Sequence, residues 1–245
     1  MIVNAHTHLG SCNIYGGNVT EKELIDSMDE NNVRAAIVQP FPGAPDPVSV
    51  HNRIYNMAKA YPGRIFGMVN LNPHMDRDSY RKEAFRCIRE LGFTAIKLHP
   101  EGHAVSLLSD TADMVFKLAD ELNVPVMVHT GHGTPFALPS LSITAARKYP
   151  NLRIILAHAG FGIYTPEAYV AATVCKNIYL ETSWCIGEDI AWLIKELGAD
   201  RIMMGADLNS NLPVEIAKYK ALGLAEDFLD KCLYGTAKDV FKLAV

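Results

Sequence analysis

Two histidines one residue apart, near the start of the chain, are the residues best suited to carry chemistry. His6 and His8 follow the short apolar run Met1-Ile2-Val3. If that run is a β-strand, side chains alternate between its two faces, so both imidazoles point to the same side. Two imidazoles on one face at a strand end can bind one metal ion. A chance pair of solvated histidines is the competing interpretation, and the rest of the chain decides between the two.

Further polar residues of types that bind metals follow directly after apolar runs later in the chain. These residues are His99, His129, His158 and Asp207, and Lys97 lies inside the run before His99. Three histidines and one carboxylate form a nitrogen and oxygen set suited to Zn²⁺, and also to Mn²⁺, Fe²⁺ or Ni²⁺. A bound divalent ion can lower the pKa of water to ~7 and polarise a carbonyl, so hydrolysis or lyase chemistry is expected.

The elements that must position these residues form one repeating pattern. Short apolar runs alternate with longer amphipathic stretches, and the eight runs are Ile2–Asn4, Ala35–Val38, Ile65–Val69, Ala95–Leu98, Val126–Val128, Ile154–Leu156, Ile178–Leu180 and Ile202–Met204. Runs that are apolar throughout are typical of strands buried on both faces of a parallel sheet. We therefore predict α/β structure, a single (β/α)8 TIM barrel domain over residues 1–245. A doubly wound open sheet is the alternative, because sequence does not show closure.

The barrel prediction would gather the polar residues at one place. Active sites of such barrels lie at the carboxyl ends of the strands. The first and eighth strands are neighbours in a closed barrel, as are the fifth and sixth. His6, His8, His129, His158 and Asp207 are then expected over one barrel mouth.

Composition narrows the function classes. The net charge of −4 argues against non-specific binding of nucleic acid, which needs a basic field. No apolar run reaches the ~20 residues of a membrane span, and no secretory signal precedes the first strand. The five cysteines are odd in number and lack a C-x-x-C pair, which favours free thiols in a reducing compartment. We expect a cytoplasmic protein that binds neither membranes nor nucleic acid.

The pattern resembles the amidohydrolase superfamily, and within it the amidohydrolase-2 branch related to aminocarboxymuconate-semialdehyde decarboxylase. The resemblance spans nearly the whole chain and rests on Asn4-Ala5-His6-Thr7-His8, Gly92-Phe93-Thr94-Ala95-Ile96-Lys97-Leu98-His99-Pro100, Ala157-His158-Ala159-Gly160, Tyr179-Leu180-Glu181-Thr182-Ser183 and Met204-Gly205-Ala206-Asp207. It implies that His6, His8 and His129 bind one divalent ion, for which Zn²⁺ is the first choice. Asp207 would be the fourth ligand and the general base, and His158 would polarise the scissile carbonyl.

Lys97 leaves a second metal arrangement open. In two-metal relatives the lysine of the fourth strand is carboxylated and bridges both ions, and His158 would then also be a ligand. In the amidohydrolase-2 branch the same Lys-Leu-His-Pro stretch goes with one metal, which we favour. An unmodified ammonium beside a divalent ion would turn toward a substrate carboxylate or a nearby acid.

The favoured function is metal-dependent hydrolysis of a carbon–nitrogen, ester or lactone bond in a small molecule. The first alternative uses the same site to decarboxylate a small unsaturated or aromatic acid, for which Arg53 and Lys97 are the candidate cations. A metal-dependent deoxyribonuclease of the related barrel family is another alternative, but that family carries Glu where Lys97 stands. A catalytically silent barrel that serves as a binding module is the remaining alternative.

Residues expected to face substrate lie on the active face of the predicted barrel. They are Lys97, Arg53 and Trp184, with His51, His103, His132 and Glu188 as further candidates. Only residues 10–19 fill the segment after the first strand, where relatives carry a longer insertion. This predicts an open site or one that another subunit completes. The expected partner is a small-molecule substrate, and the resemblance allows a homodimer.

Overall fold

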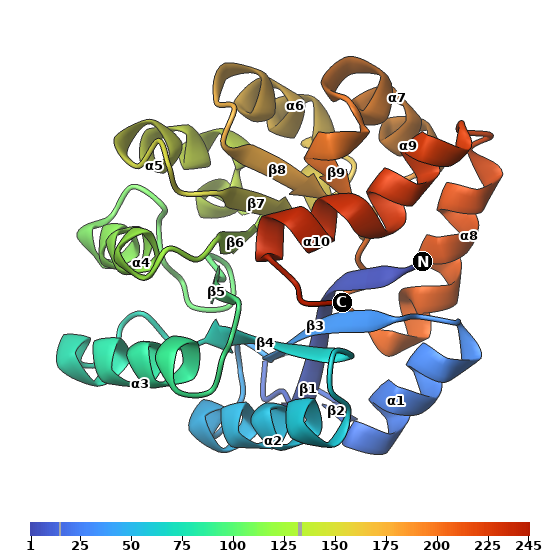
Figure 1. Ribbon diagram of the computed structural model, residues 1–245. Helices are drawn as coiled ribbons and strands as arrows, with labels where there is room; N and C mark the ends of the chain where they lie inside the picture. The colour runs from blue at the N-terminus through green and yellow to red at the C-terminus, as the bar shows by residue number, and fades with distance from the viewer. Residues whose placement is uncertain (15, 132–133) are drawn as a thin grey trace.

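The fold is a curled parallel sheet surrounded by helices, seen in a computed structural model that describes residues 1–14, 16–131 and 134–245 (Figure 1). The order of the nine strands is β2-β1-β3-β4-β5-β6-β7-β8-β9. The strands are β1 (Val3–Ser11), β2 (Asn18–Val19), β3 (Ala35–Pro40), β4 (Ile65–Asn70), β5 (Ala95–Leu98), β6 (Val126–His129), β7 (Ile154–Ala157), β8 (Ile178–Glu181) and β9 (Ile202–Met203). Every apolar run predicted to be a strand is one. The short antiparallel β2, which pairs with the end of β1, was not predicted.

The helices lie outside the sheet, as Figure 1 shows. They are α1 (Glu21–Glu30), α2 (Pro47–Ala60), α3 (Arg77–Arg89), α4 (Asp110–Leu122), α5 (Ser142–Lys148), α6 (Thr165–Val174), α7 (Gly187–Leu197), α8 (Leu212–Ala221), α9 (Glu226–Asp230) and α10 (Thr236–Phe241). The sequence Thr20-Glu21-Lys22-Glu23 predicts a capping box, and the structure contains it: the Thr20 hydroxyl accepts from Glu23 N–H, and the Glu23 side chain accepts from Thr20 N–H.

The four prolines of residues 40–49 predict a loop there, followed by a helix from Val50, but the loop is shorter in the structure. Pro40 still belongs to β3, and α2 begins at Pro47 rather than Val50. The side chain of Asp46 accepts a hydrogen bond from Ser49 N–H, and Pro47 stands in the first turn, where its missing N–H costs nothing. Local capping chemistry therefore started the helix three residues before its apolar pattern.

The sheet closes on itself, which excludes the open-sheet alternative. Ala5 N–H donates to the carbonyl of Met204 at 3.1 Å, and Ala206 N–H donates to the carbonyl of His6 at 3.2 Å. A parallel bridge also joins Thr7 to Asp207. The first strand is thus tied to the segment that continues β9, and the (β/α)8 barrel prediction is confirmed.

The barrel interior is packed and one of its ends is covered. Inward-facing side chains of the strands form one apolar cluster with residues of the C-terminal helix, and its members include Val3, Ala5, Ile37, Met68, Met127, Ile155, Met203, Val240 and Phe241. Figure 1 shows α10 lying across this end of the sheet. Arg153, which precedes β7, donates to the carbonyls of Asp239 and Val240 and so holds α10 in place.

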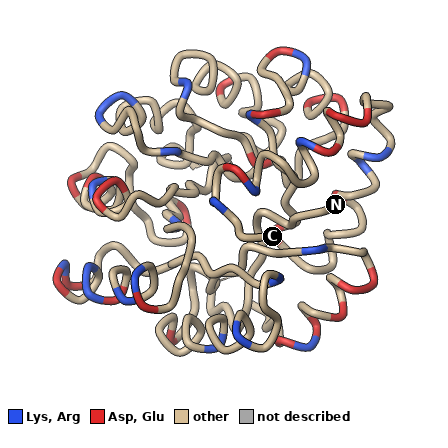
Figure 2. The backbone as a smooth tube through the Cα atoms, in the orientation of Figure 1, with Lys and Arg blue, Asp and Glu red and all other residues tan. Residues whose placement is uncertain are grey.

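Charged residues lie mostly on the outer helices, with both signs interspersed (Figure 2). All five cysteines are buried free thiols. None of the helices in the described ranges combines the length and the apolar character needed to cross a bilayer.

Candidate metal centre and active site

An irregularity in β1 brings both histidines of the first motif into the barrel. Val3 and Ala5 face the barrel interior, whereas Leu9 packs in the layer between sheet and helices. The pairing of β1 with β3 shifts register between Asn4 and Thr7. One extra residue in a strand reverses which side chains point inward, so inward positions change from odd to even numbers there. His6 and His8 therefore face the barrel mouth together, with ring centroids 5.2 Å apart.

His6, His8 and Asp207 form one group of potential metal ligands. Their donor atoms lie within 4.8 Å of one another. Asp207 Oδ1 is 3.4 Å from His6 Nε2 and 3.1 Å from His8 Nε2. Burial by itself would raise the pKa of Asp207, but the neighbouring imidazoles of His6, His8 and His158 outweigh it and hold that pKa well below its usual range. The carboxylate is therefore ionised and able to bind a cation.

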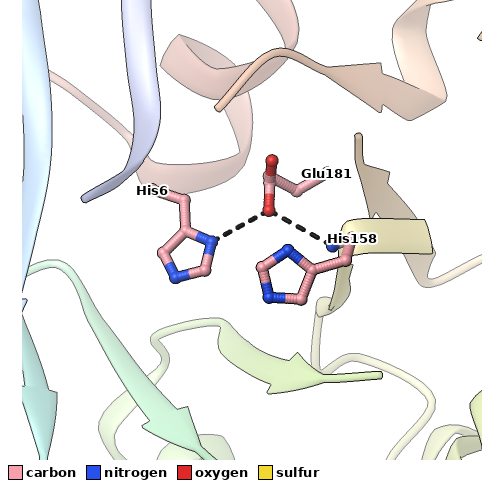
Figure 3. Close-up of side chains that lie close together, drawn as sticks. All are labelled: His6, His158 and Glu181. Carbon is pink, nitrogen blue, oxygen red and sulfur yellow. Dashed lines mark hydrogen bonds and ion pairs between the residues drawn. The ribbon is translucent and has the colours of Figure 1, made fainter. Parts of the chain in front are cut away.

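Glu181 at the end of β8 orients His6. Its Oε2 accepts a hydrogen bond from His6 Nδ1 at 2.9 Å and from the backbone N–H of His158 at 3.3 Å (Figure 3). Its Oε1 accepts from Ser183 N–H at 2.6 Å. A side chain on Gly205 would place Cβ 2.6 Å from Oε1, so only glycine leaves room for this carboxylate. The group His6, His158 and Glu181 also satisfies the spacing of metal ligands, but both Glu181 oxygens are already engaged.

The carbonyl of Pro40 orients His8 in the same way. It accepts a hydrogen bond from His8 Nδ1 at 3.1 Å and another from Asn70 Nδ2 at 2.8 Å. With Nδ1 protonated in both His6 and His8, each Nε2 keeps a lone pair directed toward Asp207. Histidine ligands are commonly fixed through the second ring nitrogen in this manner. Burial also lowers the pKa of His6 well below its usual value, which keeps that ring neutral. These donors fit a divalent metal ion.

His158 follows β7 on the adjacent wall. Its Nδ1 donates to Ser183 Oγ at 2.8 Å, and that hydroxyl donates on to Glu181 Oε2 at 3.0 Å. Its ring centroid is 5.2 Å from that of His6. Left-handed backbone places this part of the site, because φ is +68° at His158, +58° at Phe161 and +64° at Asp207. Such conformations cost of order 1–3 kcal/mol each in residues other than glycine and cluster at functional sites.

Lys97 is buried beside the ligand group, and 1% of its surface is exposed. Its Nζ lies 3.0 Å from His6 Nε2, to which it donates. Burial lowers the pKa of Lys97 to about 8, against the opposing influence of the Asp207 and Glu181 carboxylates. The amine can therefore change its protonation state near neutral pH. A metal ion on His6 Nε2 would compete with Lys97 for the same lone pair.

His129 lies on the same cavity wall as His158 but outside the group formed by His6, His8 and Asp207. Its ring stacks on His99 with centroids 4.0 Å apart, and the centroid of His158 is 4.8 Å away. His129 Nε2 is 3.2 Å from Glu101 Oε2. Its Nδ1 is buried without a hydrogen-bond partner in the described part of the chain. Burial lowers the pKa of His129, so the ring is neutral and competent as a ligand.

The proposed ligands and Lys97 line one cavity of about 810 Å³ at the carboxyl ends of the strands, and its lining includes His6, His8, Lys97, His129, His158 and Asp207. Aromatic rings form much of its wall. Phe41 stacks on His8 with centroids 4.4 Å apart, and Phe161 stacks on Trp184 at 6.0 Å. The indole Nε1 of Trp184 donates to Asp207 Oδ2 at 2.9 Å, which leaves Oδ1 toward the histidines.

The other described residues that were expected to face substrate lie elsewhere. Arg53 makes a bidentate ion pair with Glu21 at 2.7 and 2.9 Å and does not line the cavity. His51 is buried between Glu83 Oε1 and the N–H of Asn70. The remaining three are His103, whose Nε2 donates to Pro42 O; Glu188, exposed on α7; and His132, which lies outside the described residues.

Sequence analysis gave no role to several residues that the structure places at the site, among them Glu181, Glu101 and Phe161. Glu181 was part of a quoted motif, and its position at the end of an apolar run was a usable signal. Glu101 lay two residues beyond His99, and its only sign was proximity to that strand end. Phe161 has no sequence signal that we recognise, because its place depends on a left-handed turn.

Comparison with known proteins places the chain in a family. The sequence profile of the amidohydrolase family known as Amidohydro_2 matches residues 22–243. The chain belongs to this family.

Individual relatives have low sequence identity to this chain. Gamma-resorcylate decarboxylase of Polaromonas sp. is 25% identical, over 74% of this chain and 72% of that protein. Two solved structures with the same fold are each 17% identical to this chain in sequence. They are 5-carboxyvanillate decarboxylase of Novosphingobium aromaticivorans with manganese and a nitrobenzoic acid (TM-score 0.79, 99% and 96% coverage) and a dihydroxybenzoic acid decarboxylase of Polaromonas sp. with manganese and 2-nitroresorcinol (TM-score 0.74, 100% and 97%).

Proposed function

We propose that this protein is a metal-dependent decarboxylase that releases CO₂ from a small aromatic or unsaturated acid. The observation that carries the proposal is the lining of the cavity. The buried amine of Lys97 and the ligand group of His6, His8 and Asp207 share that lining with the rings of Phe41, Phe161 and Trp184. A cation pairs with a carboxylate, and stacked aromatic walls favour a flat, unsaturated body.

The curated relative supports the same reaction class, since its name is that of a decarboxylase of a hydroxylated aromatic acid. Sequence analysis placed hydrolysis first and decarboxylation second, and this support reverses the order. Decarboxylation needs a cation beside the ligand group to bind the substrate carboxylate, and Lys97 meets this requirement where Arg53 does not.

Decarboxylation of an aryl carboxylate consumes one proton and releases one CO₂. The electron pair of the broken carbon–carbon bond stays with the ring carbon, which takes the proton. One divalent ion held by His6, His8 and Asp207, with His129 as the proposed fourth ligand, would supply positive charge to the bound acid. Manganese, as in the two structural neighbours, and zinc both suit this donor set.

The chain's own residues bind the acid and handle the proton. Lys97 pairs with the substrate carboxylate. Asp207 takes up a proton from a substrate hydroxyl or from water and passes it to the ring carbon, while Trp184 holds its second oxygen. His158 keeps Nε2 toward the cavity because its Nδ1 donates to Ser183, so it can accept a hydrogen bond from the substrate.

The test is a product assay on protein loaded with Mn²⁺ or Zn²⁺. Hydroxybenzoic acids, lactones and amides are incubated in D₂O, and CO₂ release and deuterium in the product are measured. We expect CO₂ together with one deuterium at the carbon that lost it, and about one metal ion per chain. Asp207→Asn should lose this activity, and Glu188→Gln, an exposed change on α7, should keep it.

Other outcomes would assign another function. Cleavage of a lactone or amide without CO₂ would make the protein a hydrolase, with Asp207 as the general base. Purified protein that contains no metal, and neither activity nor stability lost in His6→Ala, would contradict the enzyme proposal and leave the binding module.

A further inference from the structure

We propose that Glu101 is a specificity-determining residue, which selects acids with a single carboxylate and a hydroxyl or amino group and excludes dicarboxylates. The inference rests on the proposed decarboxylase function and names the substrate class of the same site. It follows from the charges that line the cavity, from the way the turn carrying Glu101 is held, and from the hydrogen-bonding capacity of a carboxylate.

The charge pattern of the cavity is unequal. Lys97 is the one lysine or arginine among the described lining residues, whereas three carboxylates line it, those of Glu23, Glu101 and Asp207. Lys97 and the ligand group can accommodate one substrate carboxylate. A second carboxylate on the same ring would meet no further lysine or arginine in the described lining.

Glu101 is the carboxylate best placed to act on the rest of the substrate. Its side chain is 24% exposed, and Oε2 lies 3.2 Å from Nε2 of His129, itself 7% exposed. Glu23, by contrast, is exposed at the start of α1 and is engaged in the capping box with Thr20. Charge acts more strongly in the partly buried position, because water screens it less there.

The turn that carries Glu101 is held from both sides. Within the turn, Gly102 N–H donates to His99 Nδ1 at 2.9 Å. Across to the loop after β3, His103 Nε2 donates to the carbonyl of Pro42 at 3.0 Å. A Cβ on Gly102 would lie 2.7 Å from Pro42, so the two loops are in close contact. The backbone that carries Glu101 is thus fixed beside the cavity. Moving Glu101 away from a second negative charge would require breaking these contacts.

A carboxylate accepts hydrogen bonds and cannot donate them when ionised. A hydroxyl or amino group on the substrate can donate to Glu101, whereas a second carboxylate would be repelled by it. Sites built to hydrogen-bond a substrate hydroxyl discriminate against analogues that lack it. Glu101 thereby provides both an attractive element for one class of acid and a repulsive element against another.

The experiment measures binding by calorimetry and does not require turnover. Metal-loaded protein is titrated with 3-hydroxybenzoate, benzoate and benzene-1,3-dicarboxylate. We expect the hydroxy acid to bind tightest, and the dicarboxylate at least about tenfold more weakly, which is about 1.4 kcal/mol. In Glu101→Gln the dicarboxylate should gain and the hydroxy acid should lose affinity. In Glu101→Lys the order of these two ligands should reverse.

Two controls separate this effect from general damage. Glu23→Gln removes a charge from the cavity mouth but keeps the capping box, since Gln can replace Glu there, and it should leave the order of affinities unchanged. Metal content is measured in every variant because Glu101 contacts His129. Loss of metal would weaken all three acids together, whereas the proposal requires changes of opposite sign.

The outcomes distinguish this inference from the proposed function. Equal affinity of the unchanged protein for the dicarboxylate and the hydroxy acid would overturn the role of Glu101 and leave the decarboxylase proposal intact. Unchanged ligand order in both Glu101 variants, with metal retained, would also overturn it. Failure of all three acids to bind would remove the decarboxylase proposal and this inference together.

Discussion

Replacement of Glu181 by glutamine tests whether the buried carboxylate sets the protonation of His6. Its Oε2 accepts from His6 Nδ1, Ser183 Oγ and His158 N–H, and its Oε1 accepts from Ser183 N–H. Glutamine offers one oxygen and one NH₂ group in the same space. Either the NH₂ faces the Ser183 N–H, 2.6 Å away, or it faces His6 Nδ1.

Both placements are costly. In the first, a buried N–H loses its acceptor, at a cost of about 1–3 kcal/mol of folding stability. In the second, the NH₂ donates to His6 Nδ1, so the ring proton moves to Nε2 and removes the lone pair that a metal needs. Loss of such an orienting partner typically weakens metal binding about 10- to 100-fold, or about 1.4–2.7 kcal/mol.

The assay is competition for Mn²⁺ or Zn²⁺ with a chelator, accompanied by urea unfolding of the metal-free protein. Glu83→Gln is the matched control, because Glu83 Oε1 accepts from His51 Nδ1 at the same 2.9 Å, away from the ligand group. We expect both variants to lose stability, and only Glu181→Gln to lose metal affinity. Equal loss of affinity in both variants, or none in either, would refute the reasoning.

Three further predictions concern other parts of the molecule. Trp184→Phe removes the indole donor to Asp207 Oδ2, and kcat/KM for the decarboxylation should fall about 10- to 100-fold with little change in Tm, since one hydrogen bond to a charged group is lost at a side chain 37% exposed. Gly67→Ala would place Cβ 2.3 Å from the ring of Phe93 and should lower the free energy of unfolding by about 1–3 kcal/mol, measured in urea. Burial lowers the pKa of His103 to about 4, so the unfolded chain binds its proton first as pH falls below 6.5. Stability should therefore drop by about 2 kcal/mol between pH 7 and pH 5 on account of His103, and a drop of the same size in His103→Asn would contradict this.

The sequence was sufficient for the barrel because the signal is repeated. Each apolar run became a strand, and Ala95–Leu98 has the predicted bounds, since a strand buried on both faces is apolar along its whole length. The boundaries of β1 and the presence of β2 were not predictable in the same way. His6 and His8 continue the strand as polar residues facing a cavity. A search for apolar runs therefore places the end of this strand too early.

The site could be predicted only in part, because its geometry depends on contacts between distant residues. The bulge in β1 changes the residues that face inward from odd to even numbers, and no local sequence pattern marks it. The ion pair of Arg53 with Glu21 joins residues 32 apart, so an arginine that looked available for substrate is committed elsewhere. No local sequence signal marks the start of helix α5, because its seven residues lack a capping hydrogen bond from a side chain.

The left-handed backbone around the cavity has a consequence for how this chain would respond to selection. Five of the described non-glycine residues around the cavity have positive φ, and they are His158, Ala159, Phe161, Trp184 and Asp207. Each is conformationally strained, and a glycine at the same position would relieve the strain. Heat-tolerant variants should therefore accumulate glycine first at Ala159, whose side chain has no role in the site. Each such replacement would also loosen the neighbouring His158. Thermostability and turnover would then move in opposite directions along this one segment.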